Sequence, residues 1–108
     1  MAFAGVLHRE TELPIKAGKD LLAQGSDLAF RGRLMVAGSY QGPSMWKIFQ
    51  RKPYLKQVGF MNCPGGQGDV SVYRNLLVMS VEQTRGRVDC GTQGVQAQVS
   101  SERFRGVR

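Results

Sequence analysis

The sequence predicts a mainly β protein with one short helix, and three observations lead to this prediction. Apolar and polar residues alternate with a period of two over several short segments, which is typical of half-buried strands. Glycine accounts for 14 of the 108 residues, about twice its average share, and the glycines are scattered as expected for tight turns. The length suits one domain, and the hydrophobic share of 42% indicates a globular chain.

The first part of the chain predicts two elements. Residues 2–7 favour a short strand or an ordered arm, and apolar residues recur at helical spacings over residues 15–23. Pro14 suits the first position of a helix, and Gly25 would end it, whereas Gly18 lowers the helix propensity. We therefore expect one short helix in this region.

The clearest strand spans residues 28–36, where apolar residues alternate with a basic outer face that includes Arg31 and Arg33. Gly32 and Gly38 fit a strand that bends, as strands do when they curl into a barrel. A turn follows at 41–44 and a glycine-rich loop is expected at 63–69. Further strands are expected at 45–50, 54–61, 70–73, 76–81, 87–90 and 95–99.

Five to seven short antiparallel strands separated by turn signals predict a small barrel, with the oligonucleotide-binding type of barrel as the first expectation. An SH3-like barrel and a small sandwich are the alternatives. No linker divides the chain, so residues 1–100 are expected to form a single compact β domain. Residues 101–108 are expected to be a basic C-terminal tail, a weak candidate for a phosphate-binding arm.

The charge distribution is the main indication of function. The net charge is +7, from 15 Lys and Arg against 8 Asp and Glu. Residues 28–68 contain six basic residues and no acidic one. A continuous basic stretch across at least two strands indicates an anionic partner, and nucleic acid is the leading hypothesis. A solubilising surface is the alternative, although such surfaces usually mix both signs.

The candidate binding residues combine cations with aromatic rings. Cationic side chains contact phosphates and an exposed ring can stack on a base, a combination that single-strand binders use. If residues 45–51 form one strand, then Lys47, Phe49 and Arg51 project from the same face. No recognition helix is evident, so single-stranded DNA or RNA is favoured over duplex. The expected nucleic-acid-binding residues are Arg31, Arg33, Lys47, Phe49, Arg51, Lys52, Tyr54, Lys56, Tyr73 and Arg74.

Two other readings remain open. The rings of Phe49 and Tyr54 could belong to the core. Alternatively, exposed Met35, Met45 and Phe49 could anchor a protein–protein interface in an assembly module, with a homodimer or higher oligomer as its form. A small-ligand-binding barrel would instead enclose a pocket lined by apolar side chains. The residues expected to line such a pocket are Phe30, Trp46, Phe60 and Met79.

Catalytic and metal signatures are weak. His8, Cys63 and Cys90 lack the spacing of a metal site, and the acidic residues show no pairing for acid–base catalysis, so neither an enzyme nor a cofactor is expected. No apolar run is long enough to span a bilayer, and residues 1–9 do not resemble a signal peptide. A cytoplasmic location is therefore expected, where the two cysteines would be free thiols, with a disulfide as the minority alternative.

Overall fold

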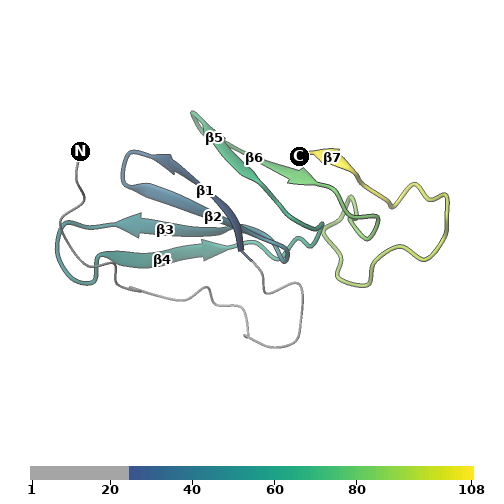
Figure 1. Cartoon of the computed structure of the whole chain (residues 1–108), viewed down its shortest axis with the longest axis horizontal. Helices are drawn as coiled ribbons and strands as arrows, with labels where there is room; N and C mark the ends of the chain where they lie inside the picture. Colours follow the sequence, from purple (N-terminus) through teal and green to yellow (C-terminus); the bar gives the residue numbers. More distant parts are fainter. Residues whose placement is uncertain (1–24) are drawn as a thin grey trace, which may run out of the picture.

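The computed structural model describes residues 25–108, in which seven β-strands form two antiparallel sheets (Figure 1). The strand or arm expected at residues 2–7 and the helix expected at 15–23 lie outside the described residues. Residues 25–108 contain no helix, and hence none that is long and apolar enough to cross a membrane. The mainly β class predicted from the alternating sequence is confirmed.

The first sheet is a four-stranded meander in which each strand pairs with the next one along the chain. Gly32 and Arg33 form the two-residue turn between the first two strands, and Gly32 has a φ of +56°, as such hairpin turns require. The prediction of one continuous strand over residues 28–36 is therefore wrong, because the chain reverses in its middle. The strands are β1 (Gly25–Arg31), β2 (Leu34–Ser39), β3 (Ser44–Ile48) and β4 (Leu55–Phe60).

The second sheet contains three strands and includes the C-terminal residues. Residues 101–108, expected to be a polar tail, contain a short strand that pairs with the preceding one through Ser80 opposite Val107. The main chains of Met79 and Arg108 exchange two further hydrogen bonds, of 2.8 and 2.9 Å. The strands are β5 (Val70–Tyr73), β6 (Leu76–Val81) and β7 (Gly106–Val107).

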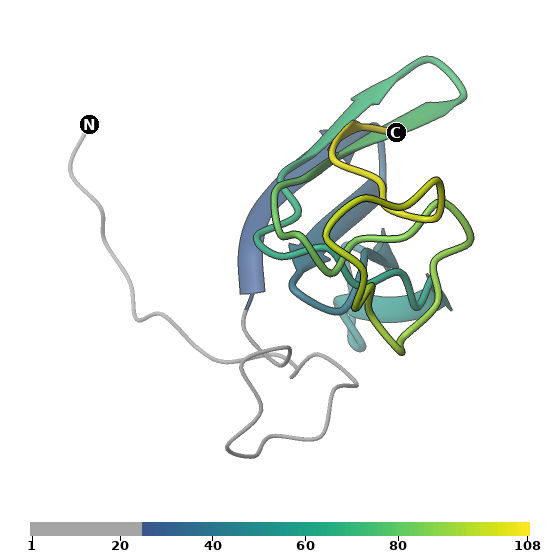
Figure 2. The same ribbon diagram turned by 90° about the vertical axis from the view of Figure 1, so that its right-hand side faces the viewer.

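The segment between β6 and β7 runs as irregular loops (Figure 2). The strand expected at 87–90 is reduced to one bridge between Arg87 and Arg103, and the strand expected at 95–99 does not form. No described strand lies beside residues 95–99 to pair with them; instead, the Arg103 guanidinium donates to the carbonyls of Ala97, at 2.7 Å, and Gln98. Alternation alone therefore gave a false strand here.

The core lies between the two sheets. Alternate residues of a strand point to opposite faces, and the inner faces contribute Val36 from β2, Val70 from β5, and Met79 and Val81 from β6. The two sheets remain separate and do not close into a barrel in the described part of the chain. The small β-rich architecture is thus confirmed, whereas the oligonucleotide-binding-type barrel and the SH3-like barrel are not.

Cys63 and Cys90 form a disulfide in this core. The expectation of free thiols is therefore wrong, and the pairing that the sequence left as the minority alternative is observed. The reason is tertiary: the β4–β5 connection and the segment after β6 bring the two Cα atoms within 4.3 Å, although 27 positions separate them in the chain.

Candidate functional site

Three hairpin connections lie toward one end of the molecule (Figure 1), and together with the strand residues that flank them we call them the hairpin end: residues 31–33, 47–56 and 73–75. The N–H of Ile48 donates to the carbonyl of Arg33 at 2.7 Å, which ties the first connection to the second. The Arg31 guanidinium donates to Asn75 Oδ1 at 2.7 Å and to the carbonyl of Arg74, which ties the first to the third. These bonds cross between separate hairpins, so they fix the three connections relative to one another.

The hairpin end contains all ten residues that the sequence predicted as a binding site. Seven of them are cationic and exposed, and none forms a salt bridge with a carboxylate of residues 25–108. Asp27 lies toward the other end of β1, where its carboxylate accepts a hydrogen bond from Val70 N–H at 2.8 Å. The cationic side chains are those of Arg31, Arg33, Lys47, Arg51, Lys52, Lys56 and Arg74.

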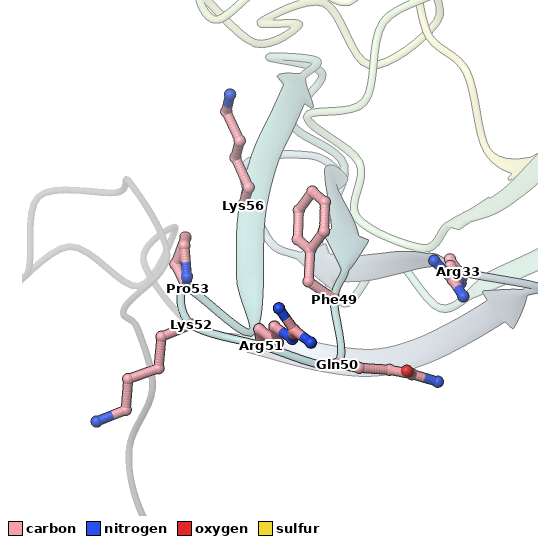
Figure 3. Close-up of a pocket in the computed structure, with 7 residues that line it drawn as sticks. All are labelled: Arg33, Phe49, Gln50, Arg51, Lys52, Pro53 and Lys56. Atoms are coloured by element: carbon pink, nitrogen blue, oxygen red, sulfur yellow. The ribbon is translucent and has the colours of Figure 1, made fainter.

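The β3–β4 loop and the neighbouring β1–β2 turn border a surface hollow of about 680 Å³. In Figure 3 the ring of Phe49 stands between β4, which carries Lys56, and the turn that carries Arg33, while the side chain of Lys52 extends away from the others. Sequence reasoning missed Gln50 and Pro53, which carry neither charge nor an aromatic ring; their position between predicted residues was the available signal. The lining residues are Arg33, Phe49, Gln50, Arg51, Lys52, Pro53 and Lys56.

Two lysines of this end oppose each other directly. Lys47 on β3 and Lys56 on β4 are partners in the strand register, so their side chains project from the same face of the sheet. Like charges in this position destabilise a sheet, and no acidic residue of the described chain is paired with either lysine. The repulsion between the two ammonium groups disfavours folding, and a bound anion would relieve it.

The aromatic rings of the hairpin end differ in exposure. Phe49 is half-buried, and Lys47 Nζ lies 5.5 Å from its ring centroid. Tyr54 is 39% exposed and Tyr73 is 62% exposed, and the Arg74 guanidinium lies 5.4 Å from the Tyr73 ring centroid. Tyr73 therefore offers the most accessible ring of the three, whereas Phe49 is the one that lines the hollow.

The structure corrects two geometric predictions about these residues. Arg31 and Arg33 do not alternate along one strand; they flank a turn, and Arg31 is bonded to the β5–β6 connection. β3 ends at Ile48, so Arg51 belongs to the loop and does not share a strand face with Lys47. The residues of the predicted set that do not line the hollow are Arg31, Lys47, Tyr54, Tyr73 and Arg74.

The apolar pocket expected for a ligand-binding barrel is not formed. Phe30, Trp46 and Phe60 lie on the face of the first sheet opposite to Val36, as the strand register shows. Met79 lies in the core on the other side of that sheet. The four side chains therefore cannot line one pocket.

Within residues 25–108, no group of three or more His, Cys, Asp or Glu side chains is placed to hold a metal ion. Comparisons of the chain with family models, curated proteins and solved structures found no match. The function has to be inferred from the hairpin end itself.

Proposed function

We propose that the hairpin end binds an extended polyanion and that single-stranded DNA or RNA is the favoured ligand. The observation that carries the proposal is the direct opposition of Lys47 and Lys56 within a group of seven cations that lacks a carboxylate partner in the described chain. Phosphate groups would supply the missing negative charge. Each phosphate that is neutralised also releases condensed counterions, which favours binding at low salt.

The arrangement of the cations favours a ligand with several phosphates. Arg33, Arg51 and Lys56 border the hollow, whereas Arg74 lies on a different hairpin that Arg31 joins to the first sheet. A single phosphate could reach one of these groups of cations, but a chain of phosphates could contact both. Arginine forks suit phosphate oxygens because they donate in a bidentate geometry.

The exposed rings favour single strands over duplex. Bases of a single strand are free to stack on aromatic side chains, and each stacked base contributes about 1–3 kcal/mol. Tyr73 and Tyr54 are exposed enough for such contacts, and Phe49 borders the hollow. A duplex shields its bases within the helix, and residues 25–108 contain no helix that could enter a groove.

Fluorescence anisotropy with labelled 12-nucleotide DNA and RNA, and with a 12-base-pair duplex, tests this proposal. The informative variants are Lys56→Glu in the hollow and Arg105→Glu, an exposed cation outside the hairpin end. Both change the net charge equally, so a purely non-specific attraction would weaken equally in both. We expect Lys56→Glu to weaken single-strand binding about tenfold, which corresponds to about 1.4 kcal/mol, and Arg105→Glu to have a much smaller effect.

Equal losses in the two variants would show that net charge, and not the hairpin end, attracts the oligonucleotide. A lack of binding by the wild-type protein at low salt would reject the proposal altogether. Circular dichroism of each variant establishes that the strands are intact.

A role in protein assembly is the second candidate, and exposed apolar side chains favour it. Leu28 is 55% exposed and Phe30 is 58% exposed on the face of the first sheet that points away from the core, and Val58 on β4 is 56% exposed. β4 also has no strand partner on its outer side in the described chain. Sedimentation equilibrium tests this candidate: association that Phe30→Ser abolishes would support it, and a monomer at all concentrations would exclude self-assembly.

A further inference from the structure

The disulfide lies next to a cation that has few other partners. Arg108 Nη1 is 2.7 Å from Cys63 Sγ and 3.0 Å from Cys90 Sγ, and the guanidinium stacks on Phe104 at 4.6 Å from the ring centroid. Its Nε and Nη2 atoms are buried and have no hydrogen-bond partner in the structure. Arg108 is thus a partly buried cation directed at a pair of sulfur atoms.

This environment suits the reduced state better than the oxidised state. A disulfide is neutral and accepts hydrogen bonds weakly, so it compensates poorly for the burial of a guanidinium; burial also lowers the pKa of Arg108 from its ordinary value. A thiolate would supply a negative charge to pair with the Arg108 guanidinium. Nearby cations also lower the pKa of a cysteine thiol. The disulfide itself leaves this charge uncompensated.

Other charges close to the sulfur atoms do not cancel this effect. Asp89 precedes Cys90, but its carboxylate is paired with the Arg87 guanidinium at 2.8 and 2.9 Å. Arg87 is also bonded to Glu102 at 3.0 Å. These three groups carry a net charge of −1, but both carboxylates are bonded to Arg87, and Arg108 is the charged group in contact with the sulfur atoms.

We propose that Cys63 and Cys90 form a redox-active site that reacts with small thiols, and that Arg108 stabilises the thiolate that leaves in the first step. The thiolate of a small thiol attacks Cys90 Sγ, because Cys90 is partly exposed whereas Cys63 is 1% exposed. The sulfur–sulfur bond breaks, a mixed disulfide forms on Cys90, and Cys63 leaves as a thiolate beside Arg108. A second small thiol attacks the mixed disulfide, which releases Cys90 and the oxidised form of the small thiol.

The consequence of reduction is local. Cys63 lies between β4 and β5, and Cys90 lies in the irregular segment between β6 and β7. This segment makes only one bridge of strand type, between Arg87 and Arg103. Reduction removes its covalent link to the core, while the backbone hydrogen bonds of the two sheets do not involve the disulfide.

The test is an equilibrium between the full-length protein and glutathione buffers of graded ratio, followed by alkylation and mass measurement of the thiols. We compare the wild-type protein with Arg108→Met, with Arg108→Lys, and with the exposed control Arg105→Met. We expect Arg108→Met to need a roughly tenfold more reducing ratio of glutathione to its disulfide for half-reduction, because the leaving thiolate loses its cation. Arg108→Lys and Arg105→Met should stay near the wild-type ratio.

A second measurement separates the charge effect from a general loss of packing. The reduced proteins are alkylated with iodoacetamide over a range of pH, and the midpoint of the rate reports the thiol pKa. We expect the wild-type protein and Arg108→Lys to react at lower pH than Arg108→Met. Equal midpoints in all three proteins would overturn the proposal, as would a disulfide that is not reduced at any glutathione ratio while the protein is folded.

Discussion

Lys47 and Lys56 face each other across β3 and β4 as direct partners in the strand register. Neither ammonium group is paired with a carboxylate of the described residues, although the sheet places them side by side. A pair of this kind opposes folding, whereas the same two charges would favour the binding of an anion. A substitution in the pair should therefore change the free energy of unfolding and the binding affinity in opposite directions.

Replacement of Lys56 by Gln should stabilise the fold and weaken binding. Removal of one of two opposed cations relieves repulsion worth about 0.2–1 kcal/mol in a cross-strand pair. The same change removes one phosphate contact from the hollow. Urea denaturation measures the free energy of unfolding, and anisotropy with a single-stranded oligonucleotide measures affinity. A loss of stability in Lys56→Gln, with unchanged affinity, would contradict the role assigned to the pair.

Acid should destabilise the segment between β6 and β7. The Arg87 guanidinium, followed by the Gly91 N–H, holds the pKa of Asp89 well below its usual range. A carboxyl whose pKa is lower in the folded state than in the unfolded state contributes stability above the unfolded value, about 4, and this contribution is lost as the pH falls toward the folded value. The thermal midpoint should therefore fall more steeply between about pH 5 and about pH 2 in the wild-type protein than in Asp89→Asn.

The matched control for this pH series is Asp69→Asn. Asp69 is another exposed carboxyl of the described chain, and it lies outside the Arg87 cluster. We expect its pH profile to follow that of the wild-type protein. Identical profiles for the wild-type protein and Asp89→Asn would show that the ion pair with Arg87 does not contribute to stability.

Loss of the disulfide should lower stability by an amount that its loop length predicts. Cys63 and Cys90 are separated by 27 positions, and closing a loop of this length in the unfolded chain is worth about 3–4 kcal/mol. Calorimetry of the double variant Cys63→Ser and Cys90→Ser, compared with the wild-type protein with and without reductant, measures this difference. The reduced wild-type protein and the double variant should unfold at similar temperatures; a double variant as stable as the oxidised protein would refute the estimate.

Gly42 should not tolerate a side chain. It has a φ of +133°, and a Cβ atom would collide with the carbonyl of Met61 and approach the Cys63 nitrogen to 2.8 Å. Gly42→Ala should therefore cost about 2 kcal/mol or more. Gly32→Ala is the control, since Gly32 also has a positive φ but an added Cβ would meet nothing within 4 Å; it should cost about 1 kcal/mol. Equal costs in urea denaturation would mean that the contact with Met61 is unimportant.

The sequence predicted most of the strands but not how they are connected. The alternation at 45–50, 54–61, 70–73 and 76–81 is confirmed by β3 to β6, and the bounds differ from the prediction only in β3 and β4. It failed at 28–36, because an alternating pattern continues unchanged through a two-residue turn, and Gly32 was interpreted as a bend. It also failed at 95–99, where alternation occurs without a neighbouring strand.

The candidate site was predictable in composition and not in geometry. The absence of acidic residues from 28–68 was visible in the sequence, and the structure gathers those cations at one end. The contacts of Arg31 with Asn75 and of Arg108 with Cys63 each join residues more than 40 positions apart. Arg108 also approaches Cys90, which is closer in the chain. Such juxtapositions depend on how the hairpins pack, which local patterns do not specify.

The most direct test of the proposed binding site is an NMR titration of the full-length protein with a 12-nucleotide single strand, following the backbone amide signals. We expect the largest chemical-shift changes in residues 31–33, 47–56 and 73–75, with little change in the segment between β6 and β7. Changes spread over all basic residues, or concentrated away from the hairpin end, would contradict the account.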